Sequence, residues 1–166
     1  PDLGRLTDNL AAFAEHSSRF DLTPVLEFFP WTNVPDFQTA LRVVEATGNT
    51  TVGVLVDTLH FDRSDSSLSD LAAAEPARFP FIHLCDAPVQ ASYRNEELLR
   101  TARAARLIPG QGDIPLADIL AHLPGSIPIA LEIPLADRSG RSCNDVAQEI
   151  FDQTKVFLQR RSLRRE

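Results

Sequence analysis

The segment Val52-Gly-Val-Leu-Val-Asp57 is an all-apolar run that ends on a carboxylate. Three other short apolar runs also end on an acidic or imidazole residue. They are Pro24-Val-Leu-Glu27, Phe79-Pro-Phe-Ile-His83 and Ile127-Pro-Ile-Ala-Leu-Glu132. Short and nearly continuous apolar runs are typical of strands that are buried on both faces of a parallel sheet. The four runs therefore predict four parallel strands, each with a polar residue at its carboxyl end.

Amphipathic helices are predicted before, between and after these strands. Pro35 suits the first turn of a helix, and Gly48 suits the position just past its end. The stretch 58–66 is expected to be a loop, and 160–166 a polar tail. The regular alternation of strands and helices predicts an α/β fold in which helices cover a parallel sheet. The expected strands are residues 23–28, 52–56, 79–84 and 127–133, and the expected helices are residues 6–20, 35–47, 67–74, 96–106, 115–123 and 144–159.

The number of strands narrows the choice of α/β architecture. A closed barrel of eight strands and eight helices takes about 250 residues, whereas this chain has 166. The chain is therefore either a small open sheet or one half of a barrel. The helix expected at residues 6–20 favours the half-barrel, because it looks like a connection from an earlier strand. Half a barrel leaves sheet edges uncovered, so we expect about 100 or more further residues upstream or the association of two half-barrels.

Composition argues against several classes of function. The formal net charge of −7 and the pI of about 5.0 argue against a general nucleic-acid binder, which needs a basic face. No run approaches the roughly 18 apolar residues of a membrane span. Cys85 and Cys143 provide no disulfide framework, so the expected setting is cytoplasmic. The sole lysine, Lys155, lies in the predicted helix 144–159, which argues against Schiff-base chemistry.

The four polar strand ends predict a metal site. In parallel α/β folds the active site lies at the carboxyl ends of the strands. Glu27, Asp57, His83 and Glu132 all occupy that edge, and three carboxylates with one imidazole suit Mn²⁺, Mg²⁺ or Co²⁺ better than a structural zinc ion. Taken singly, each acid could be a helix cap or a loop anchor, and the histidine a buried imidazole with its own partners. Charged residues rarely adjoin buried strands unless they are paired or metal-bound, so the four together favour one shared divalent ion, with Zn²⁺ also possible.

His60 follows Asp57 by three residues, in Asp57-Thr-Leu-His60. Beyond a strand end, this spacing can direct both side chains into one pocket. The alternative is a loop histidine that faces solvent.

Several motifs together resemble the second half of the xylose-isomerase-like barrels, and the resemblance runs from Thr23 to Phe157. This superfamily includes sugar phosphate isomerases and epimerases, ketose 3-epimerases, inosose dehydratases and 3-dehydroshikimate dehydratases. The resemblance implies a (β/α) barrel of the TIM type, with residues 1–166 as a single domain that contains strands five to eight of the barrel. The motifs are Leu26-Glu27-Phe28, Val56-Asp57-Thr58-Leu59-His60, Ile82-His83-Leu84-Cys85-Asp86, Arg106-Leu-Ile-Pro-Gly-Gln-Gly112 and Leu131-Glu132-Ile133.

The resemblance also implies roles for individual residues. Three carboxylates and one imidazole match the metal ligands of the family: Glu27, Asp57, His83 and Glu132. His60 matches a histidine that contacts substrate, and Arg106 resembles an arginine that binds substrate oxygen atoms in the epimerases. Arg106 has a second interpretation, as a cation favoured by the dipole at a helix C-terminus. One departure is that a second acidic residue, which some epimerases carry soon after the first glutamate, has no match here; Asn33 stands near that place.

The predicted function is a sugar or sugar phosphate isomerase or epimerase. Glu27 and Glu132 are expected to transfer a proton next to a carbonyl through a metal-stabilised enediolate. A dehydratase of an inosose or 3-dehydroshikimate type is the alternative within the same chemistry. The alternatives of other classes are a phosphodiesterase with a multi-metal cluster and a non-catalytic barrel remnant or binding module. The expected partner is a small sugar or polyol, without nucleic acid or membrane, and a homo-oligomer is possible.

Overall fold

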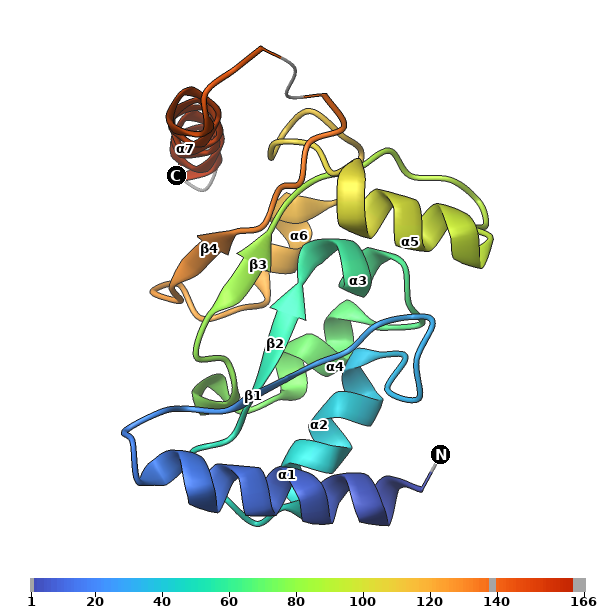
Figure 1. Cartoon of the computed structure of the whole chain (residues 1–166), viewed down its shortest axis with the longest axis vertical. Coiled ribbons are helices and arrows are strands. Elements are labelled where there is room, and N and C mark those ends of the chain that lie inside the picture. Colours follow the sequence, from blue (N-terminus) through green and yellow to red (C-terminus); the bar gives the residue numbers. More distant parts are fainter. Residues whose placement is uncertain (1, 138–139, 163–166) are drawn as a thin grey trace.

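A computed structural model describes residues 2–137 and 140–162 and contains a four-stranded parallel sheet (Figure 1). The strands lie in the same order in space as in the chain, and each neighbouring pair is parallel. This confirms the predicted α/β fold. The strand order advances in one direction without a reversal, as it does in a barrel and not in a doubly wound sheet. The strands are β1 (Val25–Glu27), β2 (Gly53–Asp57), β3 (Ile82–Leu84) and β4 (Ile129–Leu131).

Six helices occupy the predicted positions, with ends that differ from the prediction by at most three residues. Asp36 caps the second of them by accepting a hydrogen bond of 2.7 Å from the backbone N–H of Thr39. Figure 1 shows the first and last of these helices at opposite ends of the molecule, with the sheet between them. The six are α1 (Leu3–Ser18), α2 (Phe37–Ala46), α4 (Leu68–Ala73), α5 (Asn95–Ala104), α6 (Leu116–Ala121) and α7 (Cys143–Ser162).

Two short elements correct the prediction. The start of the stretch 58–66, expected as a loop, is the helix α3 (Thr58–Asp62), and a 3-10 helix, η1 (Pro76–Arg78), precedes β3. The helix α3 begins directly at the end of β2 because the Asp57 carboxylate caps its first turn. The expected polar tail is also corrected in part, since α7 continues to residue 162; residues 163–166 lie outside the described part of the chain.

The hydrophobic core lies on the face of the sheet that the helices cover. Val54, Val56, Ile82 and Leu84 alternate along β2 and β3, and none of them is exposed to solvent. All five residues of β2 are buried, which matches its position between two neighbouring strands and its continuous apolar run.

No helix among the described residues combines the length and the apolar character needed to cross a membrane.

The loop that follows α5 is fixed to the end of β3 by Asp86. The Asp86 carboxylate is buried and accepts hydrogen bonds from the backbone N–H groups of Ala87, Gly110, Gly112 and Ile114, at 2.8 to 3.1 Å. A carboxylate that accepts several backbone N–H groups satisfies donors that a buried loop would otherwise leave unpaired. The segment 107–114 is therefore fixed beside the carboxyl end of β3.

We expect Gly112→Ala to destabilise the fold. A Cβ atom at Gly112 would lie 2.4 Å from Asp86 Oδ1 and 2.6 Å from the Ala87 carbonyl oxygen, so the loop would have to move away from its anchor. The free energy of unfolding should fall by about 1 to 3 kcal/mol, as measured by urea denaturation followed by circular dichroism. Gly125→Ala is the matched control, because no atom lies within 4 Å of the added carbon. Equal stability of the two variants would contradict this account of the loop.

Candidate metal centre

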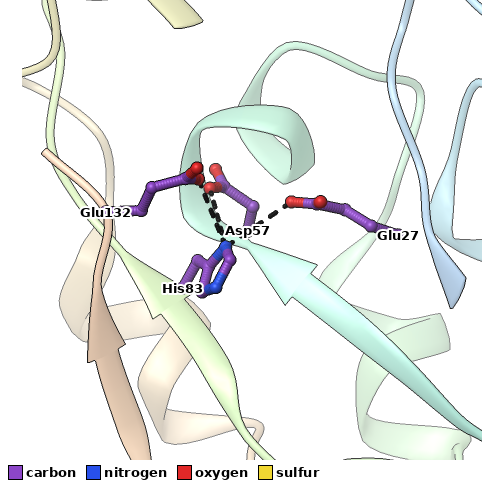
Figure 2. Close-up of side chains that lie close together, drawn as sticks. All are labelled: Glu27, Asp57, His83 and Glu132. Atoms are coloured by element: carbon purple, nitrogen blue, oxygen red, sulfur yellow. Dashed lines mark ion pairs between the residues drawn. The ribbon is translucent and has the colours of Figure 1, made fainter. Parts of the chain in front are cut away.

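Strand register brings the four strand-end residues to one face of the sheet. Asp57 and His83 are directly paired across β2 and β3. Glu27 pairs with Leu55, two residues before Asp57, and Glu132 comes two residues after the β4 partner of His83. Because side chains alternate between faces along a strand, all four project from the same side. Figure 2 shows the carboxylates directed toward the His83 ring.

The four side chains form a compact cluster. His83 Nδ1 lies 3.2 Å from Glu132 Oε2, 3.6 Å from Glu27 Oε1 and 3.8 Å from Asp57 Oδ2. One ligand atom from each residue lies within 4.8 Å of all the others. The predicted set of four residues is therefore brought together in space, and it forms a candidate metal site.

The atoms of this cluster fit a divalent cation. Glu27 Oε1 and His83 Nδ1 are both buried and lack a hydrogen-bond partner among the described residues. Buried polar atoms are rarely left unpaired, so these two atoms suggest a missing shared partner. Three carboxylate oxygens and one imidazole nitrogen are a donor set that Mn²⁺, Mg²⁺ or Co²⁺ accepts, and zinc also binds carboxylate and imidazole ligands.

The cluster is closed at Asp57 and open at Glu132. The Asp57 side chain is 0% exposed, whereas the Glu132 side chain is 48% exposed. Glu27 and His83 have intermediate exposures of 22% and 20%. A ligand would therefore reach the cluster from the side of β4 rather than through β2.

The neighbouring carboxylates favour the protonated form of His83. The interaction with the Glu27 carboxylate raises the pKa of His83; burial opposes this, and the charges of Glu132 and Asp57 add to the increase. The separation of 3.6 Å from Glu27 exceeds a normal hydrogen bond, so the attraction is mainly electrostatic. A metal ion at this nitrogen would have to displace the proton, so metal binding should be coupled to proton release.

Arg106 supplies the second cation of the cluster. Its buried guanidinium donates a hydrogen bond from Nη1 to the Asp57 carboxylate, and its Nη2 forms an ion pair with Glu132 Oε2 at 3.0 Å. Its Nε donates to the carbonyl oxygen of Ala102, in the last turn of α5, at 3.0 Å. Although burial alone would lower the pKa of Arg106, the adjacent Asp57 carboxylate raises it above its ordinary value, so the group stays charged. The hydrogen bond from Nε to Ala102 supports the interpretation of Arg106 as a cation at a helix C-terminus. Contact between Arg106 and a substrate stays a prediction.

His60 is buried beside the cluster and does not face solvent. The side chain lies on α3 and is 1% exposed, so the solvent-facing alternative is wrong. Both ring nitrogens lack a hydrogen-bond partner among the described residues. Burial, with a further contribution from the charge of Arg106, lowers the pKa of His60 to about 3. His60 is therefore a neutral imidazole with one donor and one acceptor unused, and its contact with substrate stays a prediction.

Cys85, two residues after His83, is not a reactive thiol. Burial raises the pKa of Cys85 to about 12, so the thiol is neutral near pH 7. Its Sγ lies 3.4 Å from Arg106 Nη1, and its carbonyl oxygen accepts a hydrogen bond of 2.8 Å from Thr58 Oγ1. These contacts give Cys85 a structural position behind the cluster.

Sequence reasoning missed three residues near the cluster. Asp86 belongs to the quoted motif Ile82-His83-Leu84-Cys85-Asp86, but its role as an anchor depends on backbone groups more than 20 residues away. Phe29 and Trp31 lie in the loop after β1, and their rings pack against His60. The available signal was the run Glu27-Phe-Phe-Pro-Trp31, which places three aromatic residues, Phe29 and Trp31 among them, just after an expected ligand.

A separate cavity of about 800 Å³ lies between α6, α7 and the turn 109–111. It is lined in part by Ala117 on α6 and Phe157 on α7, and none of the four cluster residues lines it. The ionisable cluster, rather than this cavity, is therefore the candidate for chemistry.

Comparisons with known proteins identify similar proteins for this chain. The family model described as "Xylose isomerase-like TIM barrel" matches residues 2–150. A "3-dehydroshikimate dehydratase" from Pseudomonas putida is 26% identical over 132 residues, which are 77% of this chain and 20% of that protein. An "Inosose isomerase" from Halalkalibacterium halodurans is 29% identical over 119 residues, which are 69% of this chain and 39% of that protein.

A solved structure has the same fold. The crystal structure of an IolI protein with a bound zinc atom aligns with a TM-score of 0.70 and 21% sequence identity, and the alignment covers 93% of this chain and 54% of that chain. The matched part therefore spans about half of that structure and less than half of each of the two sequence relatives.

We expect stability to fall below neutral pH because of His60. In the unfolded chain a histidine takes up a proton near pH 6.5, whereas folded His60 does so only near pH 3, so acidification favours the unfolded state over that interval. The loss between pH 6.5 and pH 5 should be on the order of 2 kcal/mol.

Urea denaturation at several pH values, with a chelator present, tests this expectation. His60→Leu should lose this part of the pH dependence, whereas His122→Gln, at an exposed position, should keep it. A His60→Leu variant with the same pH slope as the wild type would contradict the assignment.

Proposed function

Because the chain belongs to the xylose isomerase-like TIM barrel family, we propose that it contains the metal centre of an enzyme that isomerises or epimerises a small sugar or polyol. The observation that carries this proposal is the convergence of three carboxylates and one imidazole at the carboxyl ends of four parallel strands. The relatives named as an isomerase and a dehydratase support a substrate with a carbonyl next to hydroxyl groups. In this proposal the chain is a single domain equivalent to strands five to eight of the barrel.

We propose that Glu27, Asp57, His83 and Glu132 hold one divalent ion, which is Mn²⁺, Mg²⁺ or Co²⁺, or alternatively Zn²⁺. When bound, this ion would supply a Lewis acid that polarises the substrate carbonyl. The zinc atom bound in the IolI structure, which has the same fold, supports the proposal of a bound divalent ion. Arg106 then holds the Asp57 and Glu132 carboxylates in place, a contribution that commonly determines how well a metal centre is formed.

Glu27 and Glu132 are the proposed proton carriers. They extend toward His83 from opposite sides of the cluster (Figure 2). Glu27 Oε1 is buried and has no hydrogen-bond partner among the described residues, which suits a group that removes the proton next to the carbonyl. Glu132, on the opposite side, returns a proton to the other face of the same carbon for epimerisation or to the neighbouring atom for isomerisation. His60 and Arg106 would contact the substrate oxygen atoms.

Dehydration is the second candidate. The same proton removal by Glu27 gives dehydration if the hydroxyl group on the neighbouring carbon takes a proton from Glu132 and leaves as water. The relative named 3-dehydroshikimate dehydratase supports dehydration as the second candidate reaction. The geometry of the four residues serves both reactions, so the product has to be measured.

We expect the wild-type chain to bind one equivalent of Mn²⁺ or Zn²⁺ in isothermal titration calorimetry. His83→Gln removes the imidazole ligand at the centre of the cluster. The affinity for the metal should therefore fall by more than the roughly 10- to 100-fold expected when a residue that only positions a ligand is lost. Glu15→Gln, at an exposed position on α1, is the matched control and should bind metal like the wild type. Undiminished affinity in His83→Gln would refute the proposed ligand set.

We expect Glu27→Gln and Glu132→Gln each to lower turnover by about 100-fold or more at saturating metal, because an amide cannot carry the proton. Proton NMR in D₂O on an inosose substrate measures both the exchange of the proton next to the carbonyl and the identity of the product. An enone product indicates dehydration, and a rearranged ketone or a new epimer indicates isomerisation or epimerisation. Full turnover in either variant, with metal still bound, would exclude that residue as a proton carrier.

A further inference from the structure

Glu132 is the member of the acidic cluster whose position needs the most support. It comes just after the end of β4, and its side chain is 48% exposed. Two cations contact its carboxylate. Nη2 of Arg106 lies 3.0 Å from Oε2, and Nδ1 of His83 lies 3.2 Å from the same oxygen. A half-exposed carboxylate can turn into solvent unless a fixed partner holds it, so the place of Arg106 decides where Oε2 points.

The backbone of Arg106 is held on two sides. Its N–H donates to the Pro134 carbonyl, in the segment after β4, at 3.2 Å. The next residue, Leu107, forms an antiparallel bridge with Asp86, the second residue after β3. In this bridge the Leu107 N–H donates at 2.8 Å and the Asp86 N–H donates at 2.9 Å. The guanidinium therefore starts from a point that is fixed between the ends of β3 and β4.

The two oxygens of the Asp86 carboxylate hold the turn that follows. Oδ2 accepts the N–H groups of Gly110 and Gly112, both at 2.9 Å. Oδ1 accepts those of Ala87 at 2.8 Å and Ile114 at 3.1 Å. A charged carboxylate can accept at both oxygens, whereas an amide of the same size accepts at only one. Four backbone donors on one buried side chain thus require an aspartate and not an asparagine.

The backbone bridge and the carboxylate of Asp86 act on the same short segment. Leu107, which the bridge holds, and Gly110, which the carboxylate holds, are separated by only two residues. The first of these two, Ile108, is 2% exposed and belongs to the core. The segment 107–112 cannot leave β3 without breaking these bonds, and Arg106 directly precedes it. A shift of about 1 Å in a supporting group is enough to loosen a site of this kind.

We propose that Asp86 is a positioning residue of the metal centre. Through the segment 107–112 it sets the place of Arg106, which in turn directs the Asp57 and Glu132 carboxylates toward the centre of the cluster. This inference rests on the proposed function. The carboxylate of Asp86 itself binds backbone N–H groups, so it acts on the cluster through Arg106. Its loss should weaken metal binding by more than lost stability explains.

Asp86→Asn tests the proposal with the smallest change of shape. The amide turns an NH₂ group toward two N–H donors in either orientation, so the turn loses two hydrogen bonds. We expect the Zn²⁺ affinity measured by calorimetry to fall about tenfold, the lower end of what a residue that positions ligands contributes. Leu71→Ala is the control for lost stability. Leu71 is 1% exposed on α4, which packs against α2. This variant should lower the urea midpoint and keep the Zn²⁺ affinity of the wild type.

A double-mutant cycle shows whether Asp86 acts through Arg106. Arg106→Lys keeps the positive charge but loses the planar fork that reaches two carboxylates, so Zn²⁺ binding should weaken by roughly 10- to 100-fold. In the Arg106→Lys background, Asp86→Asn should weaken Zn²⁺ binding no further, although it should still lower the urea midpoint. Additive losses of Zn²⁺ affinity would show that the two residues act independently and would refute the proposal.

NMR of the metal-free chain reports on Arg106 directly. Its buried Nε–H donates to the Ala102 carbonyl at 3.0 Å, so it should give a ¹⁵N–¹H signal that is absent from the spectrum of Arg106→Lys. Asp86→Asn should move this signal, whereas Leu71→Ala should leave it in place. Gly112→Ala displaces the same turn without changing the carboxylate. It should also move the signal and weaken Zn²⁺ binding, and it carries the test if Asp86→Asn does not fold.

Two different results would overturn the inference. Wild-type Zn²⁺ affinity in Asp86→Asn or Gly112→Ala, or an unchanged Arg106 signal, would refute the positioning role of Asp86 and leave the proposed function standing. Absence of Zn²⁺ binding to the wild-type chain would overturn the proposed metal site and this inference together.

Discussion

The structure depends on holding three carboxylates close together at one edge of a small parallel sheet. Glu27, Asp57 and Glu132 carry like charges, and their repulsion opposes folding unless cations offset it. Arg106 bonds two of the three, and His83 lies within 3.8 Å of all three. The guanidinium adds one positive charge and the imidazole at most one more, so the cluster remains an acidic site at which a divalent cation would be stabilised.

Asp57 connects the fold to the chemistry through its two oxygens. Oδ1 accepts the backbone N–H groups of Leu59 and His60 and so begins α3, while Oδ2 faces His83 and Arg106. The cap fixes the rotation of the carboxylate, so the oxygen that faces the cluster is held by the helix itself. One residue thus sets the direction of α3, the position of the His60 ring and the closed side of the candidate metal centre.

The parts of the fold that could be predicted are those with a local signal. The strands and six helices follow from apolar patterns over 5 to 16 residues, and their ends were correct to within three residues. The helix α3 was missed because its five residues are too few to show a helical period, and because its cap is the expected metal ligand Asp57. The anchoring role of Asp86 and the packing of Trp31 against His60 could not be predicted, because each joins segments that only tertiary contacts bring together.

The sequence by itself determined the four strand-end residues and their common edge, since alternation along a strand and the parallel direction of neighbouring strands are local properties. Only the tertiary structure decided which oxygen faces which nitrogen, and which cation joins the cluster. Arg106 reaches Asp57 across 49 residues of chain, and it does so because Asp86 fixes the loop after α5 against β3. Distances of this kind depend on how the connections between strands pack, and packing is a property of the whole core rather than of any segment.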